Sequence, residues 1–448
     1  MPPIKYNSSS LSQTIPARVS SSFMKLTLTL ALLAGSNILL TLLFQWYVIT
    51  QLGVGIETDA LFAAMALPQL ILSVVSSSLT HVLVPLLANE DEQTFRQDAW
   101  GFFLGISAAF AIAALLFYLT ASLWVPPLFP GFSREAQMLT IKLTRIQLVS
   151  MVLTAAVSVL WSIYHARQRF VWAELSPLLA NCLVLLLLYK LLPVYGVAAA
   201  AWLIVLRTGL QTVWLLPGLG RWHWPRWRSP AMLEAWRRLR PLLFGTAYYR
   251  TDPLVDRFLA SMSFAGGLSL LYIGQQIYGV ANVVCEKSVA APMVPLLAKK
   301  AGAGDWTSFR QAYRRRLLSM LSLTIFGYLL LLVFGEPLLN LLIGHGGVTR
   351  ENVHTLWLIM VALVGFFVGG ASGQITATTF YAMGDTQTPT RMSIVTYSIY
   401  IPVKIIVFLR YGLIGLAAVT SLYLFVNLLV QVLLLEKFSL PRRALSKA

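Results

Sequence analysis

The sequence has little charge for its length. Only 11% of its 448 residues are charged, and the acidic residues are few, 17 against 34 Lys and Arg. Soluble domains carry about 25% charged residues. A soluble fold with 57% hydrophobic residues would expose large apolar patches to water. This excludes a soluble globular enzyme, a disordered protein and a typical nucleic-acid-binding protein, and leaves a multi-span membrane protein, in agreement with a mean hydropathy of +0.72.

Residues for metal or covalent chemistry are also scarce. The two cysteines, Cys182 and Cys285, lie in apolar runs, which excludes a disulfide framework and a metal cluster. The five histidines are scattered, and there is no Gly-rich phosphate loop, so an ATP-driven pump has no motif to support it. We therefore expect no enzymatic activity and no cofactor. A coupling ion, Na⁺ or H⁺, or the membrane potential could drive transport.

Long apolar runs dominate the chain. Crossing a bilayer takes about 20 mostly apolar residues, and about twelve runs approach or exceed that length. They lie near 26–50, 59–88, 99–124, 138–164, 171–192, 194–217, 241–262, 266–298, 317–343, 355–381, 391–409 and 411–435. The sequence thus predicts an all-α polytopic membrane protein.

The basic residues indicate the orientation of these spans. Of the 34 Lys and Arg, 23 lie in the termini and even-numbered gaps, and five lie in odd-numbered gaps. Because cytoplasmic loops are enriched in Lys and Arg, both termini and the even-numbered gaps are predicted to be cytoplasmic. The remaining six basic residues lie within predicted spans.

An internal repeat relates the two parts of the chain. The second span ends in Val84-Pro85-Leu86-Leu87-Ala88, and the eighth ends in the same five residues at 294–298. Each copy is followed by Phe-Arg-Gln, at 95–97 and at 309–311. Six spans per repeat give both copies the same orientation. This predicts two six-helix bundles related by a parallel repeat around a central cavity.

These observations give a predicted domain organisation. It consists of a cytoplasmic N-terminal segment at 1–23, a first half at 24–218, a linker at 219–236, a second half at 237–437 and a cytoplasmic tail at 438–448. The linker alternates Trp with Arg from Arg221 to Arg228. Such a pattern suits the headgroup layer, with arginines on anionic lipid phosphates, and indicates either an anchored linker or a lipid-gathering element.

Four stretches of the sequence resemble the MurJ (MviN) branch of the MOP flippase superfamily. The first runs from Thr58-Asp59-Ala60 to Leu67-Pro68-Gln69. The others are 166–181, 255–295 and 380–389, the last of which reads Phe-Tyr-Ala-Met-Gly-Asp-Thr-Gln-Thr-Pro. The resemblance implies a cavity that opens alternately to each side. It also implies movement of a polyprenyl-diphosphate-linked saccharide, such as lipid II, across a bacterial inner membrane.

The sequence departs from this family in two respects. The resemblance implies fourteen helices, whereas about twelve are predicted, without the pair thought to hold the lipid tail. The family also has cavity arginines in helices one, two and eight; the first span here has none, and Ala66 and Gln276 stand near the other two places. An exopolysaccharide or O-antigen unit is therefore as good a candidate substrate as lipid II. The alternatives are a multidrug or cation antiporter of the same superfamily and a non-transporting scaffold in polysaccharide synthesis.

A flippase of this kind implies particular partners. They are the lipid-linked saccharide, anionic membrane lipids and glycosyltransferase or polymerase machinery, without nucleic acid. Arginine pairs bidentately with phosphate oxygens, and a charge at mid-bilayer usually faces a cavity or a partner. The candidates for binding the diphosphate or lining the cavity are Arg145, Arg250, Arg257, Lys287, Lys404 and Gln276. The alternative for each cation is a local ion pair or snorkelling to the surface.

Two acids are candidates for ion coupling. Asp252 and Asp256 are four residues apart and share a helix face, so they would repel unless a cation or a proton lies between them. The resemblance matches Asp256 to an acid of the family's seventh helix that is a sodium ligand in some relatives. We hypothesise that Lys404 pairs with Asp256 as a tethered cation in place of sodium.

Overall fold

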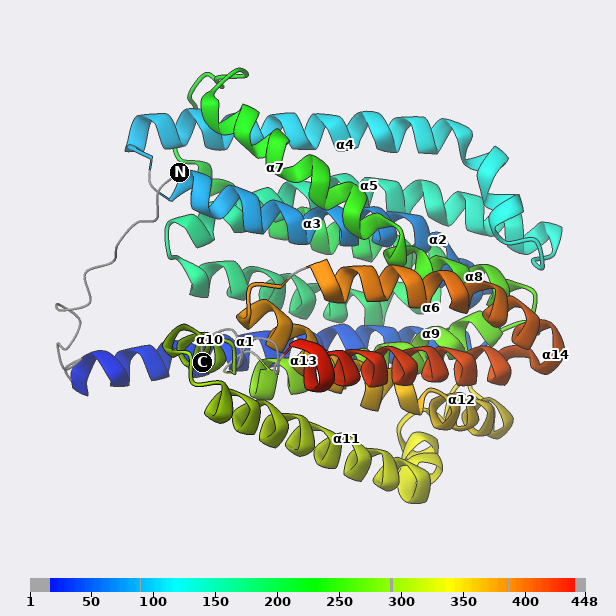
Figure 1. Ribbon diagram of the computed structural model, residues 1–448. Coiled ribbons are helices and arrows are strands. Elements are labelled where there is room, and N and C mark those ends of the chain that lie inside the picture. Colours follow the sequence, from blue (N-terminus) through cyan, green and yellow to red (C-terminus); the bar gives the residue numbers. More distant parts are fainter. Residues whose placement is uncertain (1–16, 89, 291–292, 386, 440–448) are drawn as a thin grey trace.

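The computed structural model describes residues 17–88, 90–290, 293–385 and 387–439, and every regular element in these ranges is a helix. The first half of the chain forms seven elements (Figure 1). They are α1 (Ala17–Leu52), α2 (Ile56–Ala64), α3 (Ala66–Leu87), α4 (Glu92–Leu128), α5 (Arg134–Ala166), α6 (Phe170–Leu215) and the short η1 (Leu216–Leu219).

The second half repeats this helical architecture. Its elements are α7 (Pro230–Ala247), η2 (Tyr249–Thr251), α8 (Asp252–Ser261), α9 (Gly267–Cys285), η3 (Glu286–Ala290), α10 (Met293–Ala303), α11 (Trp306–Ile343), α12 (Arg350–Ala362), α13 (Val364–Ala382), α14 (Gln387–Leu434) and η4 (Leu435–Ser439). The helix α7 begins inside the predicted 219–236 linker, because Ser229 accepts a hydrogen bond from the Met232 amide and Pro230 occupies the first helical turn.

Two of the long helices are hairpins. Eight helices in the described ranges are long and apolar enough to cross a membrane, or nine if α12 and α13, bent by 41°, form one span. The backbone of α6 turns at Gly196 and that of α14 at Gly412. In α6 the Trp172 and Trp214 rings lie 5.7 Å apart, whereas one straight helix would separate them by about 60 Å. In α14 the Tyr400 and Tyr423 rings stack at 4.4 Å.

With α12–α13 taken as one span, both legs of each hairpin counted and the less apolar α7–α8 segment added, the described residues offer twelve crossings, the number that the sequence predicts. Gly196 has φ 59° and ψ −150°, and Gly412 has φ 62° and ψ −147°. A residue with a side chain rarely adopts this conformation. The same turn therefore recurs 216 residues later, at the corresponding place in each half.

The repeat also appears where α4 and α11 begin. Asp91 accepts hydrogen bonds from the Gln93 and Thr94 amides at the start of α4, and Asp305 accepts one from Ser308 at the start of α11. Phe95 and Phe309, four residues after these caps, are both buried. The Phe-Arg-Gln motif is thus the first turn of an equivalent helix in each half, with its aromatic ring facing the bundle interior.

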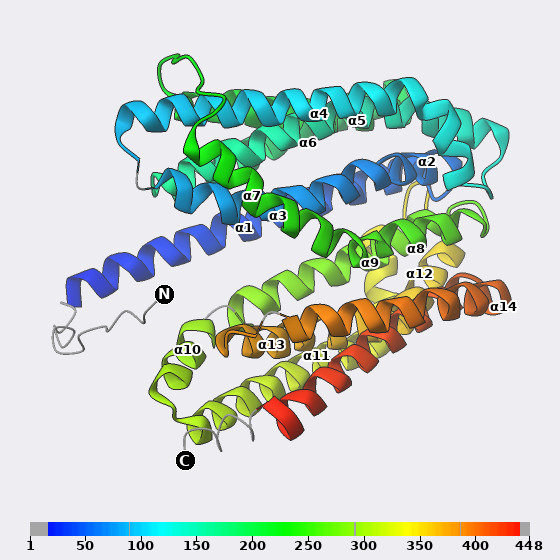
Figure 2. The ribbon, with the colours of Figure 1, turned by 45° about the horizontal axis from the view of Figure 1, so that its top comes forward.

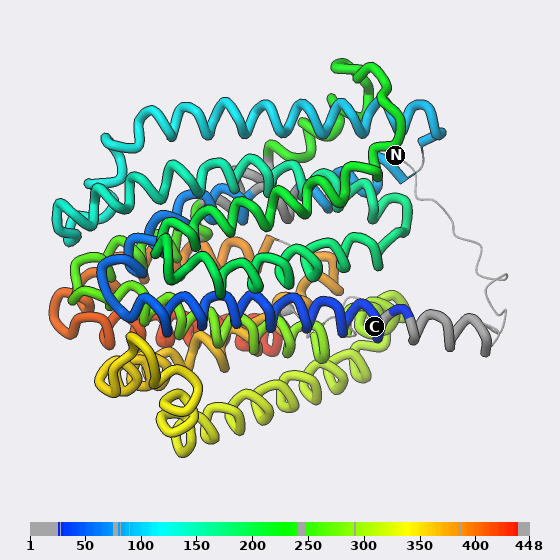
Figure 3. The backbone as a smooth tube through the Cα atoms, turned by 180° about the vertical axis from the view of Figure 1, so that it is seen from behind, coloured from blue at the N-terminus to red at the C-terminus, as the bar shows by residue number. Residues whose placement is uncertain are grey.

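The two halves form separate groups of helices (Figure 2). The helices α1 to α6 make one group, and α9 to α14 make the other. The segment α7–α8 runs from the first group to the second, with α7 packed along α3. Seen from behind, α1 runs beside the second group at its boundary with the first (Figure 3).

The linker docks on the first half through one buried acid. Arg226 donates to both carboxylate oxygens of Asp98 at 3.4 Å, and Asp98 is only 1% exposed. The Trp100 and Trp222 rings meet at 4.6 Å, and the Trp100 indole donates to the Arg221 carbonyl. The neighbouring Trp224 is 81% exposed. The linker is thus attached by some side chains and leaves others free for the lipid headgroup layer.

We expect the folded protein to lose stability as the pH rises to about 7. Burial, and then the nearby Asp98 carboxylate, raise the pKa of Glu90 to about 7. A raised carboxyl pKa adds stability that is complete below its ordinary value and is lost as the pH rises through 7. Thermal unfolding in detergent should therefore occur at a lower temperature at pH 8 than at pH 5. The Glu90→Gln variant should show no such change, and equal pH responses in both proteins would contradict this account.

Candidate functional site

A buried carboxylate joins the two halves at one end of the molecule. Asp59, in α2, is 4% exposed. Its carboxylate accepts hydrogen bonds from the Gly266 amide at 2.6 Å, the Ser269 amide at 2.8 Å and the Ser269 hydroxyl at 2.6 Å. These groups form the amino end of α9, where unpaired N–H groups and the helix dipole favour a negative charge. Asp59 therefore caps a helix of the other half.

Glycines bring the two backbones together at the same end. The Gly347 amide donates to the Thr50 carbonyl at 2.7 Å. A Cβ at Gly346, whose φ is +68°, would overlap that same carbonyl oxygen, and one at Gly266, whose φ is +93°, would overlap the Val54 side chain. Side chains at these two positions would therefore hold the halves apart.

All the hydrogen bonds between helices or loops of the two halves lie toward this end, among the described residues. They join residues 45–69 of the first half to residues 257–272 and 342–347 of the second. The loops involved are the odd-numbered gaps, which the sequence predicts to be periplasmic. Toward the opposite end the ribbons of α1 and α10 diverge (Figure 2). The structure is thus closed at the predicted periplasmic end.

Arg257 lies at the boundary between the halves. Its side chain, in α8, is buried, and its guanidinium donates to the side-chain amide oxygen (Oε1) of Gln69 in α3 at 2.7 Å. The guanidinium also lies 5.0 Å from the centre of the Tyr272 ring, whose other neighbours are Phe62 and Gln45. No carboxylate among the described residues forms an ion pair with Arg257. This predicted site residue is therefore a buried cation held by neutral groups of both halves.

The two predicted coupling acids and Lys404 form one cluster inside the second half. The Lys404 ammonium is fully buried, 2.6 Å from Asp252 and 2.5 Å from Asp256. Gln275 of α9 donates to the other Asp256 oxygen at 2.7 Å, and the Tyr400 ring lies 4.8 Å from the ammonium. The structure therefore has the hypothesised Lys404–Asp256 pair and adds Asp252 to it. It does not place Lys404 in a cavity as a diphosphate ligand, because two carboxylates surround its charge.

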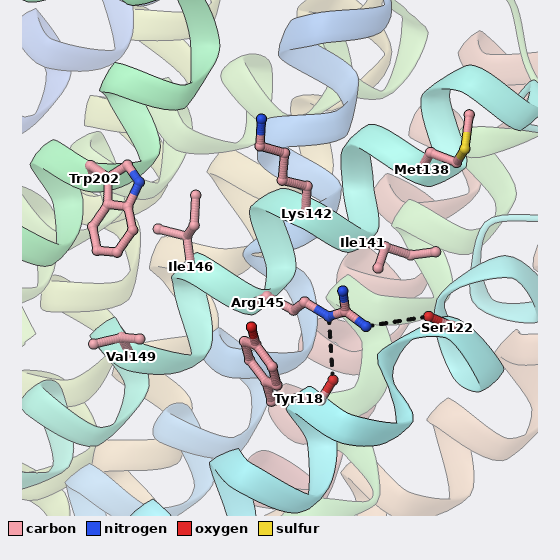
Figure 4. Close-up of a pocket in the computed structure, with 9 residues that line it drawn as sticks. All are labelled: Tyr118, Ser122, Met138, Ile141, Lys142, Arg145, Ile146, Val149 and Trp202. Atoms are coloured by element: carbon pink, nitrogen blue, oxygen red, sulfur yellow. Dashed lines mark hydrogen bonds between the residues drawn. The ribbon is translucent and has the colours of Figure 1, made fainter.

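Arg145 lies in a groove formed by the first half alone (Figure 4). The groove has a volume of about 720 Å³ and is lined by residues of α4, α5 and α6. The guanidinium donates to the Tyr118 carbonyl and the Ser122 hydroxyl, both at 3.4 Å, and Lys142 points away from it. Arg145 thus does not join the residues at the boundary between the halves.

The other three predicted residues occupy different places. Arg250 is in η2, at the break between α7 and α8, and its Nε is buried without a hydrogen-bond acceptor among the described residues. Lys287 is exposed in the π-helical turn η3 and lies within electrostatic range of Glu174 of the first half. Gln276 is half-buried, and its neighbour Gln275 is the residue that contacts Asp256.

Four residues of this site are not among those predicted from the sequence. They are Asp59, Gln69, Tyr272 and Gln275. All four lie in the stretches that carry the family resemblance, and Asp59 is an acid within a predicted span. Such a charge is by itself a reason to expect a function.

The chain is similar to known membrane proteins. The family model described as "Lipid II flippase MurJ" matches residues 48–444. A probable lipid II flippase MurJ of Vibrio cholerae is 25% identical over 202 residues, which make up 45% of this chain and 38% of the relative. A probable lipid II flippase MurJ of Bdellovibrio bacteriovorus is 23% identical over 315 residues, 67% of this chain and 59% of the relative. The chain thus spans less than two thirds of the length of either.

A solved structure has a similar fold over most of its length. It is a lipid II flippase MurJ in an inward closed conformation, and it superposes with a TM-score of 0.81 at 20% sequence identity. The superposition covers 93% of this chain and 90% of the other. The two-lobed helical architecture is therefore shared.

We expect Gly346→Ala to open the closed end, because its Cβ would overlap the backbone of α1. A cysteine at Val54, in a background without Cys182 and Cys285, should react at least several-fold faster with a membrane-impermeant thiol reagent. The matched control is Gly384→Ala. Gly384 has a similar φ of +77° but no atom within 4 Å of its Cβ position, so this variant carries the backbone strain without the clash. Equal acceleration in both variants would show that closure does not depend on the Gly346 contact.

We expect Lys404→Met to destabilise the protein strongly, because it leaves two buried carboxylates without their cation. Removing one partner of a buried pair costs about 3–5 kcal/mol. Thermal unfolding in detergent should show this loss, and adding Asp252→Asn and Asp256→Asn should restore most of it. Lys142→Met, at an exposed lysine in α5, is the control. A triple variant no more stable than Lys404→Met would contradict the ion-pair account.

Proposed function

The chain belongs to the lipid II flippase MurJ family, and from this premise we propose that it moves a polyprenyl-diphosphate-linked saccharide across the bacterial inner membrane. Lipid II is the first candidate substrate. The protein is a multi-pass membrane protein, and the proposed direction is outward, from the cytoplasmic leaflet.

The observation that carries this proposal is the unequal pairing of the buried charges. Both acids of the second-half cluster, Asp252 and Asp256, already contact Lys404. Arg257 meets only neutral groups of the two halves. A guanidinium that contacts no carboxylate directly therefore remains at the boundary between the halves. This favours an anionic substrate over the cationic drugs of the multidrug antiporters, which need acidic cavity residues.

Arg257 could exchange its present partner for the substrate. A hydrogen bond from a guanidinium to a charged oxygen is roughly twice as strong as one between neutral groups. A diphosphate could thus replace the Gln69 side-chain oxygen at low cost. Because Gln69 belongs to the first half and Arg257 to the second, the same exchange would loosen one contact between the halves. Substrate binding and the opening of the closed end could be linked in this way.

The Lys404 cluster supports a proposal about ion coupling. A tethered ammonium already lies against Asp252 and Asp256 and offsets one of their two charges, so a sodium ion would have to compete with it there. We expect the transport rate to be the same in Na⁺ and in K⁺ at equal membrane potential. Strict dependence on sodium would argue against this role of Lys404.

The test of function is rescue of a bacterial strain depleted of its lipid II flippase. The native chain should rescue growth, and Arg257→Ala should lower the flipping rate in reconstituted vesicles at least ten-fold, because the diphosphate loses its cation. Arg257→Lys should keep part of the rate, and Arg316→Ala, at an exposed arginine of α11, should keep all of it.

A second substrate is tested in the same vesicles. Ala66 and Gln276 stand near places where the resemblance expects cavity arginines, which favours a different lipid-linked oligosaccharide. Vesicles that carry such an oligosaccharide in place of lipid II separate the two cases. Flipping of the oligosaccharide alone would reassign the substrate, and flipping of neither would overturn the proposed function.

A further inference from the structure

A polar cavity lies inside the first half, separate from the contacts that close the molecule. It has a volume of about 460 Å³ and is lined by residues of α1, α3, α5 and α6. Eight of the eleven lining residues are polar, and none is acidic. Polar side chains are costly within a membrane span and usually mark a functional path. An apolar lining would suffice if the cavity only held the bundle together.

The hydroxyl groups of this cavity offer acceptors. Thr41 donates its hydroxyl proton to the Asn37 carbonyl at 2.9 Å, and Thr154 donates to the Ser150 carbonyl at 2.8 Å. Because each proton is used inside its own helix, the hydroxyl oxygen is left to accept a hydrogen bond. The wall of this cavity therefore presents hydrogen-bond acceptors as well as positive charge.

Other groups of the same wall offer donors. The Asn181 amide donates to the Asn37 side-chain oxygen at 2.5 Å, which leaves the Asn37 amide nitrogen as a donor. The Trp161 indole nitrogen is buried and has no acceptor among the described residues. Arg207 forms no ion pair with a described carboxylate and adds its guanidinium. An unused buried donor is costly unless a ligand satisfies it.

This mixture of groups identifies the class of ligand. A metal or organic cation would require acids, which the lining does not have. The ionised diphosphate of a polyprenyl lipid offers only acceptors and would be repelled by the threonine oxygens. A saccharide carries both hydroxyl donors and acceptors, and its ring can lie against an indole. We propose that this cavity binds a sugar ring of the lipid-linked substrate, which rests on the flippase function proposed above.

The position of the cavity relative to Arg257 supports this assignment. Asn37, Thr41 and Gln45 are spaced four residues apart and form one stripe along α1. Gln45 donates to the Tyr272 hydroxyl at 3.3 Å, and the Arg257 guanidinium covers the Tyr272 ring. The stripe is about 12 Å long, from the helical rise per residue. A sugar in the cavity and a diphosphate at Arg257 would therefore be neighbours, as they are in the substrate.

The experiment compares binding of two lipids to the full chain in detergent, by native mass spectrometry. One is lipid II, and the other is undecaprenyl diphosphate, which has no sugar. Arg207→Met and Trp161→Phe should each weaken lipid II binding at least ten-fold and leave undecaprenyl diphosphate binding unchanged. Thr120→Val is the control, because Thr120 also donates to its own helix but is exposed on α4. It should change neither.

A second measurement tests the cavity without the lipid. In a background without Cys182 and Cys285, a cysteine at Thr154 should be protected from a thiol reagent by soluble N-acetylglucosamine at least three-fold. A chain that binds neither lipid but shows this protection would overturn the flippase proposal and retain the sugar site. Absence of protection, or equal weakening of both lipids by Arg207→Met and Trp161→Phe, would overturn the sugar site.

Discussion

The capping of α9 by the Asp59 carboxylate is the contact on which the relation between the two halves depends. Its three hydrogen bonds fix the rotation of α9 about its own axis as well as its position. Tyr272 lies three residues beyond Ser269, and Gln275 lies three residues beyond Tyr272, so each side chain is turned by about 60° around α9 from the one before. Asp59 thereby places the ring that covers Arg257 and the amide that contacts Asp256. Helix caps usually come from the same bundle as the helix. This cap comes from the other bundle, and it therefore aligns functional side chains of α9 with those of the first half.

The cations within the spans fall into two classes, those paired with carboxylates and those without such a partner. In the low dielectric of the membrane the two classes differ greatly in free energy. Lys404 is neutralised by two carboxylates of its own half, and breaking that cluster would leave buried charges unpaired. Its contribution is therefore structural and persists while the halves move. Arg257 and Arg207 have no such carboxylate among the described residues. A buried cation without a counter-ion is stabilised by any anion or acceptor that enters. The paired cation, Lys404, stabilises one half. The cations without a carboxylate partner, Arg257 and Arg207, are available to bind a substrate.

Much of the fold could be predicted from the sequence, because hydrophobic run length and the repeated Val-Pro-Leu-Leu-Ala motif report local properties. The breaks near residues 193 and 410 were also predicted, and they are the hairpin turns at Gly196 and Gly412. The site was predicted less completely. The pairing of Lys404 with Asp256 followed from the cost of unpaired charge, but the partners of Asp59 lie 207 and 210 residues away. Gln276 is predicted as a cavity residue because it stands near the place of a family arginine, whereas the contact of Gln275 with Asp256 depends on how α8 packs on α9. The sequence also could not show whether Arg145, a basic residue within a span, lies at the boundary between the halves or in the groove formed by α4, α5 and α6.

The chemistry of the closed end explains how it could also open. The halves meet there through backbone contacts of Gly266, Gly346 and Gly347 and through the Asp59 cap, all in loops or at helix ends. When such groups separate at the membrane surface, water can replace each lost hydrogen bond, so the net cost per bond is only about 0.5–1.5 kcal/mol. A large apolar interface would instead cost about 25 cal/mol for each Å² exposed. Apolar contacts such as the stacked Phe62 and Tyr272 rings also join the halves, but the polar contacts lower the cost of separating them, so that one substrate could shift the two states of a transporter. The exchange of Gln69 for a diphosphate at Arg257 would supply such a shift, because it weakens the closed state while adding a charge-assisted bond to the substrate.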